Sequence, residues 1–242
     1  MGIAYNPTIP KQGLQFLYDE GNTSKSGLTK DLVSGTTLGF TTNFTHTSEL
    51  ANLTKLTAAS DVGGSSAPAG STGLTLILWN KRTDEHTGTW NEMSTFTGSG
   101  GGARYRTWWL GYFYQQTARI HWSIPYYTTD GGTSVTYWSI NPYWSDAGLT
   151  LNIGQFYSIM CTYDNSSRNT AVYINGRVSA TGTRPGYGDL NDPAAGGTLR
   201  IRGTRENTFL NNQSKFFALY NRPFSTDEVS QVHETMKSRF GY

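Results

Sequence analysis

Short apolar or alternating segments, each bounded by turn-forming residues, recur along the whole chain. This recurrence is typical of an antiparallel sheet system, because successive side chains of a strand point to opposite faces, and Gly, Asn, Asp and Ser close the turns. The clearest predicted strands are residues 14–18, 74–79, 156–163, 171–174, 177–180, 198–202 and 215–220. The pattern therefore predicts an all-β fold.

The most specific local signal is the pair Asn175-Gly176, which separates the predicted strands 171–174 and 177–180. Both residue types adopt positive φ angles at low cost, so they can close a two-residue β-hairpin. Strands 74–79 and 156–163 are so rich in apolar residues that we expect both of their faces to be covered. These two strands are therefore the predicted centre of the core.

A short helix is predicted after the last strand. Ser225 and Glu228 have the spacing of a capping box, in which each side chain satisfies a backbone N–H of the first turn. The residues that then fall on one helical face are Val229, Val232, His233 and Met236. Because His233 belongs to this stripe, we expect it to be a packed residue rather than a ligand.

The chain of 242 residues is long for an average domain but ordinary for a β-sandwich, so we expect a single domain over residues 1–242. Lys and Arg number 19 against 17 Asp and Glu, and no dense basic run occurs. A chain without a basic patch lacks the usual electrostatic attraction to nucleic acid or to a membrane, so neither partner is predicted. The sequence also predicts neither a cleaved signal nor a membrane span.

The single cysteine, Cys161, lies in an apolar segment, so we expect a small buried packing residue. One cysteine excludes an intrachain disulfide and a zinc site built from several thiolates. The sequence also lacks the motifs of zinc proteases, serine esterases and phosphate-binding loops. We predict neither a cofactor nor a bound metal.

The carboxylates show no catalytic pattern. The densest titratable group, Asp84-Glu85-His86, is expected at a solvated loop tip, since adjacent residues of a strand would point to opposite faces. Four aspartates in turn-like surroundings have the oxygen chemistry of calcium ligands, although the sequence does not bring them together: Asp130, Asp164, Asp189 and Asp192. The prediction is a binding protein without catalytic residues.

An aromatic band between residues 108 and 144 is the most unusual part of the chain. The segment 122–126 is echoed by 138–143, with the turn-forming Asp130-Gly131-Gly132 between them, which predicts a hairpin. On strands, about half of the aromatic side chains must face the core. The others suit a protein interface or a sugar, because Tyr and Trp combine a flat apolar ring with a polar tip.

The candidate binding residues of this band are Trp108, Trp122, Tyr126, Tyr127, Trp138, Tyr143 and Trp144. We favour a protein interface over a sugar site, because no loop that could orient a sugar through hydrogen bonds is identifiable from the sequence. Both uses of the band stay open at this point.

Several segments carry a family resemblance: residues 13–19 followed by 31–35, strand 74–79, the hairpin from Tyr163-Asp164 to 172–176, and the closing stretch 217–225 with Glu228-Val229. Together they resemble the laminin G-like branch of the concanavalin A lectin/glucanase superfamily, in the version common in structural proteins of tailed bacteriophages. The terminal segments 1–7 and 237–241 look like those of marine tailed phages, cyanophages in particular. The resemblance implies an antiparallel two-sheet jelly-roll sandwich with one short C-terminal α-helix.

Two segments depart from the family pattern. Residues 45–72 replace the strand that usually precedes 74–79. The aromatic segment 104–145 is longer than the pattern needs, and we interpret it as an insertion that carries partner specificity. The Glu-x-Asp-x-x-Glu pattern of laminarinase-like members is absent, which again predicts that the chain is not an enzyme.

The resemblance implies a non-enzymatic virion structural protein of a tailed bacteriophage, as a capsid decoration or appendage subunit. It would attach to other virion proteins within a homo-oligomer or another symmetric assembly. Its location would be the virion, after synthesis in the cytoplasm of an infected bacterial host. The alternative is a carbohydrate-binding, lectin-like module that recognises a host surface glycan, since fold alone does not fix function.

Overall fold

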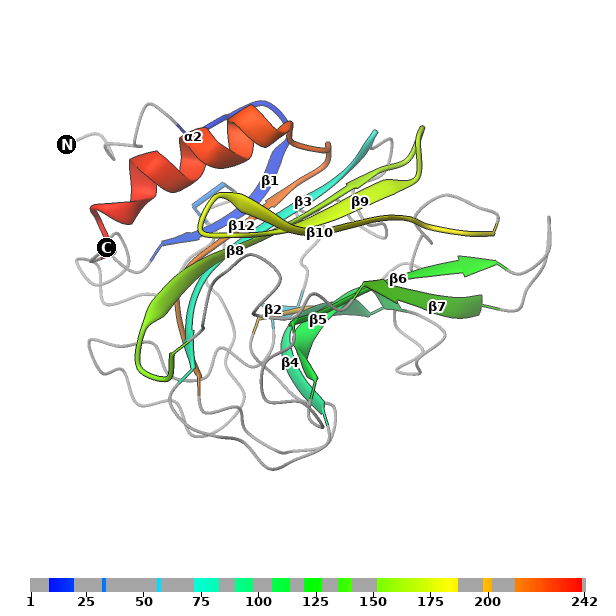
Figure 1. Ribbon diagram of the computed structural model, residues 1–242, viewed down its shortest axis with the longest axis horizontal. Coiled ribbons are helices and arrows are strands. Elements are labelled where there is room, and N and C mark those ends of the chain that lie inside the picture. Colours follow the sequence, from blue (N-terminus) through cyan, green and yellow to red (C-terminus); the bar gives the residue numbers. More distant parts are fainter. Residues whose placement is uncertain are drawn as a thin grey trace.

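The computed structural model describes residues 9–19, 32–33, 56–57, 72–82, 90–97, 106–113, 120–127, 135–140, 152–186, 198–201 and 212–240. These residues form two six-stranded sheets and the helix α2 (Thr226–Lys237). Figure 1 shows the sheets as two layers, with α2 on the outer side of one of them. The predicted antiparallel two-sheet sandwich with a C-terminal helix is confirmed.

The first sheet has the strand order β1-β12-β3-β8-β9-β10. Its strands are β1 (Leu14–Asp19), β3 (Gly73–Arg82), β8 (Phe156–Asp164), β9 (Asn169–Ile174), β10 (Arg177–Thr183) and β12 (Asn212–Tyr220). The second sheet has the order β2-β11-β4-β5-β6-β7. Its strands are β2 (Leu56–Thr57), β4 (Trp90–Thr97), β5 (Arg106–Phe113), β6 (Ile120–Tyr127), β7 (Val135–Ile140) and β11 (Thr198–Ile201).

Strands β3 and β8 are covered on both faces, as their apolar sequences predict. They pair along their whole length, with Ile77 opposite Met160 and Leu76 opposite Cys161. Ile77 and Met160 belong to the cluster that packs under α2, whereas the alternate positions point away from the helix toward the second sheet. Cys161 is fully buried, as predicted, and burial raises the pKa of its thiol.

The predicted hairpin at Asn175-Gly176 is also confirmed. It joins β9 to β10, with Ile174 opposite Arg177, and both turn residues have positive φ angles of 51° and 74°. These are the angles that a two-residue turn needs to match the twist of its strands. In the order of the described strands, β10 is the last strand of the first sheet.

Helix α2 begins as predicted. Ser225 and Glu228 form both hydrogen bonds of the capping box, and the predicted apolar stripe, Val229, Val232, His233 and Met236, is buried. The His233 ring stacks on Trp79 at 6.1 Å between centroids, and its Nδ1 lies 2.8 Å from Ser158 Oγ. Burial lowers the pKa of His233, so this histidine is a neutral packed residue near pH 7.

The aromatic segment supplies β5, β6 and β7, which make up half of the second sheet. Strands β6 and β7 pair antiparallel, so the predicted hairpin is confirmed in its strands, while its turn at Asp130-Gly131-Gly132 lies outside the described residues. The cluster Asp84-Glu85-His86 lies outside them too. Among the described residues, no helix combines the length and apolar character needed to cross a membrane.

Candidate functional site

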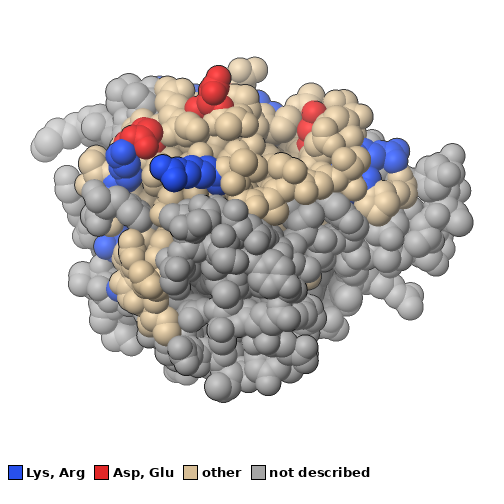
Figure 2. All heavy atoms as spheres, viewed as in Figure 1, with Lys and Arg blue, Asp and Glu red and all other residues tan. Residues whose placement is uncertain are grey.

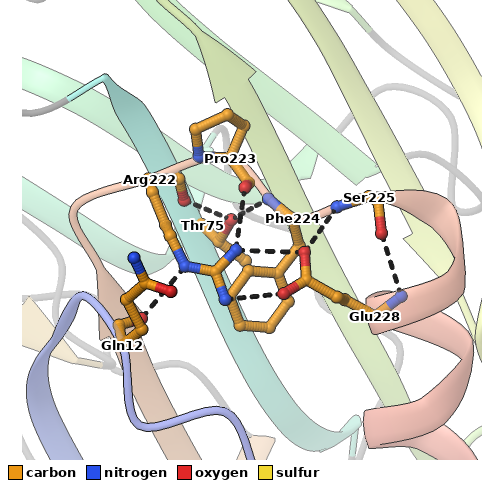
Figure 3. Close-up of polar contacts among 7 residues, drawn as sticks. All are labelled: Gln12, Thr75, Arg222, Pro223, Phe224, Ser225 and Glu228. Carbon is orange, nitrogen blue, oxygen red and sulfur yellow. Dashed lines mark hydrogen bonds and ion pairs between the residues drawn. The ribbon is translucent and has the colours of Figure 1, made fainter.

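The loop between β12 and α2 is held by the side chain of Arg222. Its guanidinium donates two parallel hydrogen bonds to Glu228, at 2.6 Å to Oε1 and 3.0 Å to Oε2, and its Nε donates to the carbonyl of Gln12 at 3.0 Å. Figure 3 shows Arg222 between the segment that precedes β1 and the first turn of α2. Arginine suits this position because its planar fork can bond a carboxylate at two points and still donate to a third group.

Thr75 of β3 fixes the same loop from below. Its hydroxyl donates to the carbonyl of Arg222 at 2.8 Å and accepts the backbone N–H of Phe224 at 2.9 Å (Figure 3). Thr75 is fully buried, so both bonds are shielded from water. The Phe224 ring packs at 4.5 Å from that of Tyr220, which completes a rigid loop over the sheet.

A groove lies beside this loop on the outer face of the first sheet, and we call it the outer groove. Its volume of about 670 Å³ falls within the range of small-molecule sites. The lining residues come from β8, β9, β10, the turn after β8, the loop between β12 and α2, and the first turn of α2: Thr162, Asp164, Ser167, Asn169, Thr170, Ala171, Tyr173, Thr181, Gly182, Thr183, Pro223, Phe224, Ser225 and Glu228. Ten of these fourteen residues carry a hydroxyl, amide or carboxylate group, while apolar atoms supply the larger share of the lining surface.

The floor of the outer groove is hollow because small side chains meet there on three neighbouring strands. Ala171 of β9 pairs with Thr162 of β8 on one side and with Thr181 of β10 on the other. Two pairs further along, on the same face of the sheet, the Thr183 hydroxyl donates to Asn169 Oδ1 at 2.8 Å. Tyr173 follows Ala171 on the same face, and its hydroxyl lies 3.3 Å from that of Thr226.

Asp164 closes the groove at the β8–β9 turn. Its Oδ1 accepts hydrogen bonds from the backbone N–H and the hydroxyl of Ser166, at 2.8 and 2.7 Å, and a longer one from the N–H of Ser167 at 3.4 Å. Burial alone would raise the pKa of Asp164, but these hydrogen bonds outweigh it and the pKa is lowered. Asp164 is therefore ionised at neutral pH.

Glu228 is also ionised, because the hydrogen bonds from Arg222 lower its pKa, with a further contribution from the N–H of Ser225. Asp164 and Glu228 are the charged residues of the lining, and both are acidic. A retaining or inverting glycosidase needs one carboxyl group with a raised pKa to act as the general acid. In the outer groove, the pKa values of both carboxylates are lowered instead.

Trp122 was predicted to lie on a binding surface, but the structure places it in the core. The residue is fully buried, and its indole Nε1 donates to Thr170 Oγ1 at 2.8 Å, which ties β6 to β9 across the sandwich. A ring without exposed surface has no face for a sugar or a partner, so this part of the prediction is wrong. Trp122 belongs to the half of the band that faces the core.

The other predicted residues are placed only by strand register. Trp108 of β5 pairs with Phe96 of β4, and Trp138 of β7 pairs with Ile124 of β6. Tyr126 and Tyr127 stand at the end of β6, opposite residues 136 and 135. Tyr143 and Trp144 lie outside the described residues. The sheet thus brings four of the predicted residues onto neighbouring strands, and their use in binding stays a prediction.

Sequence reasoning missed the outer groove. Of its lining residues, Asp164 was singled out as a calcium-ligand candidate, and Ser225 and Glu228 only as a helix cap; Asp164 Oδ1 instead caps a turn. Within the ranges that the structure describes, no group of three or more His, Cys, Asp or Glu residues could hold a metal ion. The alternating threonines of β10 indicate a polar face of the sheet. One wall of the outer groove, however, is formed by residues 223–225, which are distant from β10 in the sequence, so no local pattern predicts the groove.

The two-sheet sandwich and the helix on its outer side define a concanavalin A-like class of fold. Residues 56–230 match the Concanavalin A-like lectin/glucanases superfamily, and the chain belongs to this family. The comparison with curated proteins gives no match.

Similar solved structures include toxin binding domains. The botulinum neurotoxin serotype G binding domain is 15% identical, with a TM-score of 0.65, over 93% of this chain and 51% of that one. The receptor binding domain of the botulinum neurotoxin C/D mosaic serotype is 13% identical, with a TM-score of 0.61, over 92% and 51% of the two chains. The binding domain of Paraclostridial Mosquitocidal Protein 1 is 14% identical, with a TM-score of 0.59, over 91% and 52%. At these identities the likeness shows the fold, and the chain spans about half the length of these structures.

Proposed function

We propose that the chain is a non-catalytic, lectin-like module that binds a carbohydrate on a host or receptor surface. The observation that carries this proposal is the outer groove, whose lining offers hydroxyl, amide and carboxylate groups beside small apolar surfaces. Sugar hydroxyls both donate and accept hydrogen bonds, so they suit a lining of this mixed kind. The superfamily and the similar receptor-binding domains support binding as the general role.

The state of the carboxylates supports binding without catalysis. Both oxygens of Glu228 are occupied by the guanidinium of Arg222 and the N–H of Ser225. Because the pKa values of Glu228 and Asp164 are both lowered, neither side chain holds a proton at neutral pH that it could donate to a glycosidic oxygen.

The wider setting of the module is also part of the proposal. The sequence resemblance to tailed-phage structural proteins supports a place in a virion, as a decoration or appendage subunit within a symmetric assembly. There the module would hold the particle to a glycan of the bacterial surface. On the face shown in Figure 2, acidic and basic side chains of the described residues are interspersed, which suits a neutral ligand better than nucleic acid.

A glycan array with the full chain tests the proposed function. We expect selective binding to a small set of glycans, confirmed by titration calorimetry, and no release of reducing ends from the same glycans. A folded chain that binds nothing on a broad array of bacterial and marine polysaccharides would contradict the proposal. Mass spectrometry of purified particles tests the virion setting separately, and absence of the chain from them would overturn it.

A further inference from the structure

We propose that the outer groove binds a neutral saccharide through two adjacent hydroxyl groups, one bound by Asp164 and the other by Asn169. This inference rests on the proposed function and names the site and the ligand class. Asp164 ends β8 and Asn169 begins β9, one step beyond the pair Tyr163 and Thr170. In an antiparallel pair such residues stand opposite each other on the same face of the sheet, about 5 Å apart at Cβ.

Asp164 provides the acceptor. Its Oδ1 takes the hydrogen bonds of the turn from Ser166 and Ser167, whereas no hydrogen bond is formed by its Oδ2 within the described residues. An ionised carboxylate oxygen can only accept, so its partner must be a donor such as a sugar hydroxyl. The turn therefore fixes the carboxylate through one oxygen and leaves the other for a ligand.

Asn169 provides the donor. Its Oδ1 accepts from the hydroxyl of Thr183, which leaves the Nδ2 amide group as the ligand-facing donor. The bond to Thr183 also decides which way the amide points, because a hydroxyl donor selects the carbonyl oxygen. A ring hydroxyl that accepts from Asn169, next to one that donates to Asp164, satisfies both residues at once.

The rest of the floor suits the body of a sugar ring. The side chains of Thr162 and Thr181 flank the methyl group of Ala171 on the neighbouring strands, so hydroxyl groups surround a small apolar surface. A pyranose ring has the same alternation of C–H and O–H groups. Pro223 adds an apolar wall on the side of the loop that Arg222 and Thr75 hold rigid.

Charge decides the class of saccharide. No Lys or Arg belongs to the lining, and Asp164 and Glu228 are both ionised. The nearby Arg222 is committed to Glu228 and Gln12. Arg168, which precedes Asn169 in the β8–β9 turn, lies outside the lining and donates to the carbonyl of Gly186. Carboxylated or sulfated sugars would meet two carboxylates in the lining itself, so the outer groove favours neutral sugars.

The test uses the full chain and the glycans that it selects on the array. Asp164→Asn keeps an acceptor for the turn but replaces one carboxylate oxygen with an amide, and Asn169→Ala removes the donor. We expect each variant to weaken binding of a neutral oligosaccharide about tenfold or more in calorimetry. Thr181→Trp should fill the groove and abolish binding, whereas the control Val178→Trp, on the same strand but outside the lining, should bind within about twofold of the wild type.

Each outcome decides between the two proposals. Glycan binding that survives Asp164→Asn, Asn169→Ala and Thr181→Trp overturns the inference and leaves the lectin function standing at another site. The absence of any glycan binding overturns both. Circular dichroism and urea midpoints confirm that each variant is folded. The wild-type chain gives a test without mutation, because acidic oligosaccharides that bind as tightly as neutral ones of equal length would refute the charge argument.

Discussion

Replacing Thr75 with valine tests whether one buried hydroxyl holds the wall of the outer groove. The substitution keeps the shape of the side chain but removes both hydrogen bonds, to the carbonyl of Arg222 and from the N–H of Phe224. Phe224 is only 4% exposed, so its N–H has no access to water once the hydroxyl is gone.

The magnitude follows from these two groups. Leaving a buried polar group without a partner costs about 1–3 kcal/mol. The N–H of Phe224 is fully shielded, while Arg222 is half-buried and its carbonyl recovers part of the loss from water. We expect Thr75→Val to lower the free energy of unfolding by about 2–4 kcal/mol, a large part of the roughly 5–15 kcal/mol of a typical domain.

Thr75→Ser gives the matched comparison, because it keeps the hydroxyl and loses only a methyl group, at a cost of about 1 kcal/mol. Urea unfolding followed by circular dichroism and tryptophan fluorescence measures both variants, with Thr181→Val as the control at an exposed threonine of β10. The order of stability should be wild type, serine, valine. A valine variant as stable as the serine variant would refute the reasoning, because the methyl group would then matter more than the hydroxyl.

Four further outcomes are expected. Arg222→Lys should lower the free energy of unfolding in urea by about 1–2 kcal/mol, because an ammonium group cannot bond both oxygens of Glu228 and the Gln12 carbonyl together. An unchanged free energy would show that the planar guanidinium is not needed here. The pKa of Glu228 is lowered in the folded chain, so its ionised form stabilises the fold above the unfolded pKa of about 4.3, and this stabilisation is lost as the pH falls through the folded pKa. Glu228→Gln should therefore lose less stability than the wild type between about pH 5 and 3, and parallel plots of unfolding free energy against pH would contradict this. Gly176→Ala should lower the free energy of unfolding by about 1–3 kcal/mol, because φ is 74° and the new Cβ would lie 2.9 Å from the Cβ of His233. An unchanged melting temperature would exclude that contact. Because the pKa of His233 is lowered in the folded chain, the unfolded chain takes up the proton first, and stability should fall as the pH drops below about 6.5. His233→Gln should flatten the dependence of the urea midpoint on pH between about pH 7.5 and 5.5, and an unchanged dependence would assign it to other groups.

The sequence predicts those parts of the fold that depend on local signals. Asn175-Gly176 determines its hairpin through two φ angles, and Ser225 with Glu228 determines the start of α2 through two hydrogen bonds within one turn. The apolar segments of β3 and β8 identify the core because no other environment accepts them on both faces.

The candidate site depends on contacts that the sequence pattern does not contain. Alternation along β6 shows that half of the aromatics face inward, but only the pairing of the two sheets shows that Trp122 is one of them. The outer groove needs Thr75 beneath a loop that follows it by about 150 residues, as the separation of 149 between Thr75 and Phe224 shows. Such juxtapositions are set by the topology of the sheet rather than by any local motif.

The position of β12 in the first sheet has a consequence for the order of folding. Strand β12 lies between β1 and β3, and it is the sheet neighbour of β1. Among the described strands β12 is the one that pairs with β1, so during synthesis β1 emerges long before residues 212–220, with which it pairs, have left the ribosome. Closure of such distant pairs makes folding slow, and it leaves the apolar strands β3 and β8 dependent on a late segment for their cover.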